Sequence, residues 1–259
     1  MKNIYGAVII VAFSICLIQL GGCGSDPEPD QCLNKEVIGG SFSIGESISN
    51  YGGVDTLLLS DTVITDNFAV FRADSNYASY NWKIGDDPRT FTTKAVSLFF
   101  RYPVSSLPIR LIATWIPDKK CFPEDDGIDT VYRYLTVIDK ELNPIFGSYE
   151  GALSSNPTDI YTVEITPDYY SSRFYLTNIN KGCEASNVNV FMRFGYKAVS
   201  LSQSEGDQFY AGSCKSPKGW IFLDKSGTEI TATYTVGNGS EFQSETIRSK
   251  EKFIGKKQL

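Results

Sequence analysis

The sequence predicts an all-β protein with two consecutive domains, and three observations lead to this fold class. From residue 36 onward, short runs of β-branched and aromatic residues alternate with glycine, asparagine, aspartate, serine and proline. No apolar pattern with the 3.6-residue period of a helix continues for three turns. A polar break with a proline at residues 139–144 divides the strand-rich part in two. Such alternation is typical of antiparallel sheets with one face on a core.

The first 22 residues have the features of a secretion signal. Lys2 precedes an apolar run over residues 7–18, which is shorter than the roughly 20 apolar residues of a membrane-spanning helix. Leu20-Gly21-Gly22-Cys23 follows and resembles the lipobox of bacterial lipoproteins. The resemblance implies cleavage after Gly22 and attachment to a membrane through a lipid on Cys23. An ordinary secretion signal with an incidental cysteine is the alternative.

Residues 23–34 are expected to form an acidic tether. Residues 24–31 include three acidic residues and two prolines, and no apolar side chain that could pack. Fully extended at ~3.3 Å per residue, this segment reaches about 25 Å. Acidic residues soon after the lipidated cysteine resemble the surface-export signal of outer-membrane lipoproteins, although a plain solvated spacer explains them equally well. We expect an outer-membrane protein that faces the cell surface, with a periplasmic orientation as the alternative.

Residues 35–141 are predicted to form the first β domain. Seven short strands in about 100 residues is the density of an immunoglobulin-like sandwich. The predicted strands lie at residues 37–43, 56–60, 67–72, 79–84, 95–101, 108–116 and 129–137. In the strand 108–116, Trp115 is in phase with the apolar face and is expected in the core.

The segment Tyr80-Asn81-Trp82-Lys83-Ile84-Gly85-Asp86-Asp87 resembles the Tyr-x-Trp-x-x-Gly-Asp signature of PKD-like domains. The resemblance implies an immunoglobulin-like sandwich with Trp82 in its core and a Gly-Asp turn after its strand. Three later runs match the strands that follow in that family, at residues 91–100, 111–115 and 130–137. The chain departs from the family in the turn, where Asp87 replaces the usual glycine, and in lacking the His-x-Tyr element.

Residues 142–259 are predicted to form a second antiparallel β domain. Its predicted strands lie at residues 160–166, 173–178, 188–194, 198–202, 219–224, 229–236 and 245–254. The opening segment Gly147-Ser148-Tyr149-Glu150-Gly151 resembles the start of small lipocalin-like barrels in bacterial surface lipoproteins. That resemblance implies a small barrel. Seven strands can equally form a second sandwich, so both architectures stay open.

Four cysteines remain once Cys16 leaves with the signal and Cys23 carries the lipid. An even number in an exported chain favours disulfides, and no C-x-x-C spacing indicates zinc. The four residues are Cys32, Cys121, Cys183 and Cys214. Pairing Cys32 with Cys121 and Cys183 with Cys214 keeps each bond within one predicted domain, whereas the other pairings join the domains.

Composition and motifs exclude several functions. The chain has 30 acidic and 24 basic residues, a net charge of −6, which disfavours nucleic acid as a partner. It contains no histidine, so histidine-based triads and metal sites are excluded. No nucleophile elbow, P-loop or dinucleotide-binding pattern is present. We predict no catalytic residue, cofactor or metal; the acidic loop 123–129 lacks EF-hand spacing and is interpreted as a solvated turn.

Three aromatic residues are the candidate ligand-binding side chains. Tyr169 and Tyr170 lie in a predicted loop, and Trp220 begins a predicted strand. Flat rings at a surface stack on sugars or anchor a protein partner. The alternative is that they cap the core of the domain. Lysines and an arginine alternate near the C-terminus, at 248, 250 and 252, and are interpreted as protection of an edge strand.

These observations predict a lipid-anchored, non-catalytic binding or scaffold protein. One version binds glycans as part of a nutrient-uptake system. Adhesion or assembly through a surface protein partner is the alternative. A polysaccharide-active enzyme is the third possibility, because a pair of catalytic carboxylates is identified only by its geometry.

Overall fold

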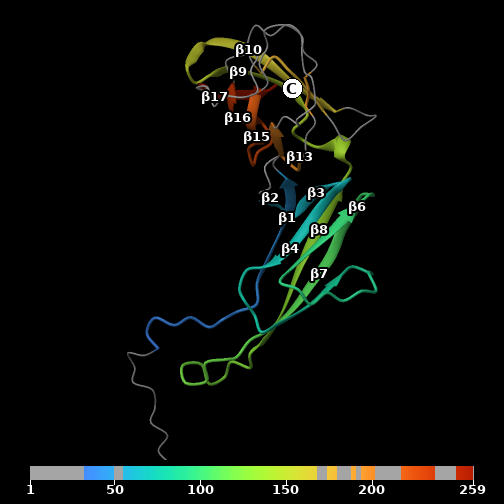
Figure 1. Cartoon of the computed structure of the whole chain (residues 1–259), viewed down its shortest axis with the longest axis vertical. Coiled ribbons are helices and arrows are strands. Elements are labelled where there is room, and N and C mark those ends of the chain that lie inside the picture. Colours follow the sequence, from blue (N-terminus) through green and yellow to red (C-terminus); the bar gives the residue numbers. More distant parts are fainter. Residues whose placement is uncertain are drawn as a thin grey trace, which may run out of the picture.

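A computed structural model describes residues 32–49, 55–167, 174–179, 188–190, 194–201, 217–236 and 249–258 of the chain. Three sheets make up this part, together with the short 3-10 helix η2 (Lys140–Leu142) (Figure 1). The predicted all-β class is therefore confirmed. Within the described ranges, no helix has the length and apolar character needed to cross a bilayer.

Two four-stranded sheets pack face to face as an N-terminal sandwich. The first has the order β2 (Asp55–Leu59), β1 (Phe42–Ser49), β4 (Asn67–Ala73), β6 (Ala95–Phe100). The second has the order β3 (Thr62–Ile64), β8 (Ile128–Ile138), β7 (Val104–Thr114), β5 (Ser79–Ile84). All pairs are antiparallel except β3 with β8. Both sheets contribute alternate side chains to one core cluster, as a period-2 pattern requires.

Trp82 lies at the centre of this core, as predicted. Its side chain is fully buried and meets the ring of Phe42 edge-on, with centroids 5.1 Å apart. The indole N–H donates to the carbonyl of Thr93 at 2.8 Å, so burial leaves this donor satisfied. The prediction that Trp115 is also a core residue is wrong in part. Strand β7 ends at Thr114, and the half-buried Trp115 instead donates its indole N–H to Asp125 at 3.0 Å.

The C-terminal part forms one nine-stranded antiparallel sheet that curls into half a barrel (Figure 1). Its strand order is β12 (Val188–Val190), β11 (Phe174–Thr177), β10 (Asn156–Pro167), β9 (Gly147–Leu153), β17 (Ser249–Lys257), β16 (Glu229–Val236), β15 (Pro217–Leu223), β14 (Ala198–Leu201), β13 (Phe194–Gly195). A single curled sheet favours the barrel-like alternative over a second sandwich. Its concave side is lined by apolar side chains that pack into one cluster.

Two glycines allow a very close approach of β9 and β17. Gly151 and Gly255 face each other in register. A Cβ atom on Gly151 would lie 1.9 Å from the carbonyl oxygen of Ile254, which is far inside contact distance. Only glycine fits at such a close approach of two strands. The second glycine of the Gly-x-Tyr-x-Gly segment therefore serves this close packing of the two strands.

The two domains share a packed boundary. Ile64, on the outward side of the sandwich, is 2 % exposed and belongs to the C-terminal core together with Ile145. Asn143 follows η2 and donates its side-chain N–H to the carbonyl of Gly195 at 2.9 Å. The backbone N–H of Lys140 donates to the hydroxyl of Thr65 at 3.0 Å. These contacts occupy the segment 139–144, where the sequence indicates the break between the domains.

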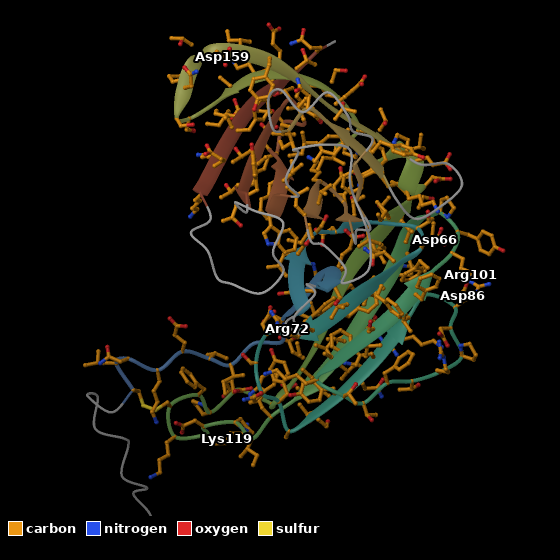
Figure 2. All side chains as sticks on the ribbon, turned by 45° about the horizontal axis from the view of Figure 1, so that its top comes forward. Asp66, Arg72, Asp86, Arg101, Lys119 and Asp159 are labelled. Carbon is orange, nitrogen blue, oxygen red and sulfur yellow. A yellow bond between two sulfur atoms is a disulfide. The ribbon has the colours of Figure 1, made fainter. Side chains whose placement is uncertain are left out.

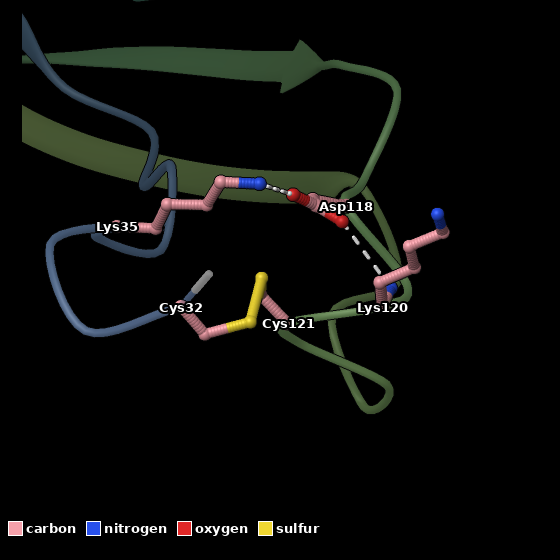
Figure 3. Close-up of a disulfide and its surroundings, with 5 residues drawn as sticks. All are labelled: Cys32, Lys35, Asp118, Lys120 and Cys121. Atoms are coloured by element: carbon pink, nitrogen blue, oxygen red, sulfur yellow. Dashed lines mark hydrogen bonds and ion pairs between the residues drawn. A yellow bond between two sulfur atoms is a disulfide. The ribbon is translucent and has the colours of Figure 1, made fainter. Parts of the chain in front are cut away.

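A disulfide joins Cys32 to Cys121, which is the predicted pairing, with the Cα atoms 5.4 Å apart (Figure 3). Beside it, the ammonium of Lys35 pairs with Asp118 at 2.6 Å. The segment before β1 and the loop between β7 and β8, which the disulfide joins, lie at the end of the sandwich opposite the C-terminal sheet (Figure 1), and Figure 2 labels Lys119 of that loop at the same end.

The first and last strands differ from their predicted positions. The chain is not a strand at 37–41, and β1 covers residues 42–49. Gly40 there donates its N–H to the carboxylate of Asp129 at 2.9 Å, a side-chain contact that replaces ladder pairing. The last strand is β17 at 249–257, three residues beyond the predicted end.

Candidate functional site

The structure places one of the three candidate aromatic residues. Trp220 lies in β15, whereas Tyr169 and Tyr170 fall outside the described residues. Cys23, Cys183 and Cys214 also fall outside them, so the second predicted disulfide and the lipid site remain predictions. The candidate site is therefore built from β15 and the strands beside it.

Trp220 points away from the core of the curled sheet. Its neighbours Ile221 and Leu223 are buried in the C-terminal core, and residues alternate between the two faces of a strand. Phe222 shares the outward face and is 42 % exposed. The two rings stack with their centroids 5.7 Å apart and an angle of 12° between their planes. Capping of the core, the alternative explanation for Trp220, does not describe this outward pair.

Hydroxyl groups adjoin this pair on the next strand. In the β15–β16 register Trp220 is opposite Thr233 and Phe222 is opposite Thr231. The two threonines are half-buried and lie on the same outward face. Neighbouring strands are about 4.8 Å apart, so hydroxyl groups lie beside the rings at the spacing of one strand.

The strand beyond, β17, adds a cation and an aliphatic side chain. Lys252 is opposite Thr233, and Ile254 is opposite Thr231. Two parallel rows therefore cross three strands, one from Trp220 to Lys252 and one from Phe222 to Ile254. Each row joins an aromatic ring, a hydroxyl group and a long side chain.

The interpretation of the C-terminal lysines as edge protection is wrong. Strand β17 pairs with β16 on one side and with β9 on the other, so it lies inside the sheet. Lys256 is flanked in register by Glu229 and Glu150, which balance its charge. Lys252 faces Thr233 on β16, so its charge is available at the outward surface beside the aromatic pair.

A fixed turn holds the aromatic strand in place. Asp224, at the end of β15, accepts hydrogen bonds from the hydroxyl of Ser226 and from the backbone N–H groups of Thr228 at 2.9 Å and Glu229 at 3.0 Å. These donors, the Ser226 hydroxyl above all, hold the pKa of Asp224 far below its usual range. Gly227 completes the turn with φ of +79°, a conformation that favours glycine.

The concave side of the sheet offers no comparable reactive group among the described residues. Its tyrosines use their hydroxyls inside the core: Tyr149 donates to the carbonyl of Ile145 and Tyr234 to that of Ile179, both at 2.8 Å. Burial raises the pKa of Tyr161 to about 12 and raises the pKa values of Tyr149 and Tyr234 further. These phenols stay neutral and structural.

The acidic loop is a hydrogen-bonded turn. Asp125 accepts from the N–H of Gly127 at 2.9 Å, and Asp126 accepts from that of Ile128 at 3.1 Å. Asp125 also accepts the indole N–H of Trp115. In the described part of the chain, no group of three or more acidic or cysteine side chains is placed to hold a metal ion.

Phe222, the two threonines and Lys252 were not identified from the sequence. The alternation Trp220-Ile221-Phe222 does place both rings on one face, and this signal was available. The threonines and Lys252 depend on the pairing order β15-β16-β17, which no local pattern specifies.

No protein-family model matches this chain, and neither a curated protein nor a solved structure was found to match it.

Proposed function

We propose that this protein is a lipid-anchored, non-catalytic glycan-binding module of a bacterial cell surface. The observation that carries the proposal is the stacked pair of Trp220 and Phe222 on the outward face of the C-terminal sheet. The signal, the Leu-Gly-Gly-Cys23 segment and the acidic tether support the lipid anchor. The resemblance of the first domain to PKD-like domains supports a spacer role for the sandwich.

The chemistry of the surface favours a sugar chain as the ligand. A pyranose presents a flat face of C–H groups, which packs on an aromatic ring, and a rim of hydroxyls that exchange hydrogen bonds. Trp220 and Phe222 supply the rings, and Thr231, Thr233 and Lys252 supply polar groups alongside. Phe222, Lys252 and Ile254 are exposed, so this side of β15–β17 is accessible, whereas the neighbouring residues of β14 that pair with the rings, Ala198 and Ser200, are buried.

The position of the disulfide supports presentation of this surface away from the membrane. Cys32 is held at the end of the sandwich opposite the C-terminal sheet (Figure 1). Strand β8 runs along the sandwich for 11 residues, or about 36 Å at ~3.3 Å per residue. An anchor at Cys23 therefore leaves the curled sheet at the distal end of the molecule.

Affinity electrophoresis of the purified protein through gels that contain neutral polysaccharides tests the proposal. We expect retardation by at least one polysaccharide, no release of reducing ends, and about tenfold weaker binding for Trp220→Ala. Tyr102→Ala, which removes a 76 % exposed ring elsewhere, is the matched control and should bind normally. Hydrolysis, or retardation that is unchanged in Trp220→Ala, would contradict the proposal.

A protein partner is the second candidate, and a different surface favours it. Phe68 and Phe99 are 50 % and 44 % exposed on the outward side of the β4–β6 pair, with ring centroids 5.2 Å apart. Exposed aromatic pairs are typical of protein contacts. If no polysaccharide retards the protein, adhesion or assembly through this pair becomes the better explanation, and loss of cell-surface assembly in Phe68→Ser would identify it.

A further inference from the structure

The outward side of the second sandwich sheet carries two exposed tyrosines beside two cations. Tyr132 and Tyr134 of β8 are each 59 % exposed. In register, Tyr132 is opposite Arg110 of β7, and Arg110 is opposite Lys83 of β5. Lys83, Arg110 and Tyr132 therefore form one row across three adjacent strands, which we call the cationic row.

Like charges that face each other on neighbouring strands lower the stability of a sheet. Lys83 and Arg110 make such a pair, and no acidic residue compensates it at the outward positions of segments 79–83, 108–114 and 130–136. Apart from Pro108 and Ile112, these positions carry hydroxyl, amide, phenol or cationic side chains. A concentration of positive charge here is notable because the chain as a whole is acidic.

Arg110 is not neutralised within the described part of the protein. Its Nε is buried and has no hydrogen-bond partner there, and no ion pair joins its guanidinium to another described residue. Leaving this buried donor unpaired costs free energy. The Nε atom itself is out of reach of a ligand, whereas the rest of the half-buried side chain is in part accessible. The guanidinium therefore fits an anionic ligand that approaches from the outward side.

The ammonium of Lys83 donates to the backbone carbonyl of Asp87, and it lies close enough to the Asp87 carboxylate to help lower the pKa of that group. The Asp87 carboxylate is itself taken by Arg89, which donates from both Nε at 3.0 Å and a terminal nitrogen at 2.6 Å. Arg89 holds the pKa of Asp87 below its usual range, at about 2, so this carboxylate stays ionised and paired. Because Asp87 is shared by two cations and bonds directly to Arg89, it balances the charge of Lys83 only in part.

We propose that the cationic row and Tyr134 form a second binding surface, which takes an acidic polysaccharide. A sugar ring stacks on the exposed tyrosines, and its carboxylate or sulfate group lies between Arg110 and Lys83. A nucleic acid carries a phosphate at each nucleotide and requires more extensive cation contacts, against the net charge of −6. This surface is separate from the Trp220 face and does not depend on it.

Affinity electrophoresis of the purified protein with polygalacturonate and its methyl ester tests the inference, because the two polymers share a backbone and differ in charge. We expect retardation by polygalacturonate and not by the ester. Arg110→Gln and Tyr132→Ala should each weaken the retention about tenfold, the factor that corresponds to losing one charge-assisted or stacking contact. Trp220→Ala should retain polygalacturonate binding, which separates this inference from the proposed function.

Matched controls remove a cation and a phenol from other surfaces. Arg72 lies on the outward side of the other sheet, and Tyr102 lies in the β6–β7 loop. The variants Arg72→Gln and Tyr102→Ala should both bind polygalacturonate normally. Thermal unfolding shows whether Arg110→Gln still folds. If that variant does not fold, Tyr132→Ala still tests the inference, because Tyr132 is exposed and its replacement should not affect folding. Equal retention by the ester, unchanged binding of both variants, or tighter binding of oligothymidylate than of polygalacturonate overturns the inference.

Discussion

The carboxylate of Glu46, a residue of the sandwich strand β1, accepts a hydrogen bond from the backbone N–H of Tyr196 in the C-terminal sheet. The same carboxylate accepts from the N–H of Ile64 at 2.8 Å and from the side chain of Asn67 at 3.2 Å. The side chain is fully buried. One acidic group of β1 thus links strands β3 and β4 of the sandwich to a turn of the second domain across the boundary between the domains.

Replacing this carboxylate should weaken the boundary. In Glu46→Gln, the amide NH₂ must face one of the N–H donors, and an unpaired buried donor costs about 1–3 kcal/mol. We expect the free energy of unfolding, measured with urea at pH 8, where Glu46 is ionised, to fall by that amount. Glu141→Gln, at an exposed position in η2, is the matched control and should change little. An unchanged midpoint for Glu46→Gln would show that the contact with Tyr196 does not stabilise the protein.

Glu46 should also make stability depend on pH. Burial raises the pKa of Glu46 to about 7 from 4.5, although its three donors partly oppose this shift. The folded state then holds a proton that the unfolded state has lost, so stability is greatest below pH ~4.5 and falls as the pH rises toward 7. The fall is at most about 3 kcal/mol for a shift of this size.

Urea unfolding at several pH values between 4.5 and 7 measures this dependence. No imidazole titrates in the window, because the chain contains no histidine. The slope should largely disappear in Glu46→Gln and persist in Glu141→Gln. A slope that is equal in both variants would assign the effect to other carboxyl groups.

The sequence predicts the local elements of this protein better than their arrangement. Alternation places β5 at its observed bounds, 79–84, and β16 at 229–236, because one face of each strand is apolar. The three-residue strand β3 is missed, since Thr62–Ile64 is too short for a period to appear. Ile64 also packs into the core of the other domain. A segment of three residues carries no pattern that predicts such a contact.

The sequence identifies one residue of the candidate site, Trp220, and does not identify the residues around it. The reason is related. Trp220 stands out as a large ring in a β-rich chain, whereas Thr231, Thr233 and Lys252 are ordinary until the sheet order is known. The same holds for the boundary between the domains. From the sequence alone, an acidic residue such as Glu46 is expected to face solvent. Its burial follows from contacts 18 and 150 residues away.

The disulfide should contribute strongly to stability. It connects residues 89 positions apart, and the chain-entropy model gives about 4–5 kcal/mol for a loop of that length. We expect Cys32→Ser to lower the free energy of unfolding by roughly this amount, as measured with urea under non-reducing conditions. Addition of reductant should destabilise the wild type more than the variant, in which only the predicted Cys183–Cys214 bond is left to reduce. Peptide mapping that finds Cys121 linked to Cys183 would contradict both the pairing and the prediction.

If Cys23 carries a lipid anchor, replacing this cysteine should change where the protein is located and leave its fold unchanged. Cys23→Ser removes the thiol that we propose as the lipid acceptor, so we expect the protein to leave the membrane fraction or to remain unprocessed. Cell fractionation followed by blotting measures this outcome. Cys16→Ser, in the apolar part of the signal, is the matched control and should be anchored normally. Membrane retention of processed Cys23→Ser would show that the lipoprotein assignment is wrong.

Adjacent residues of β15 should separate ligand binding from folding. Ile221 faces the core and is fully buried, so Ile221→Ala should lower the free energy of unfolding by about 2–5 kcal/mol. Phe222 faces outward and contacts Trp220, so Phe222→Ala should leave stability within about 1 kcal/mol of the wild type. In affinity gels, Phe222→Ala should lose polysaccharide retention, whereas folded Ile221→Ala should keep it. Comparable retention in the two variants would mean that the stacked pair is a structural feature and that the ligand binds elsewhere.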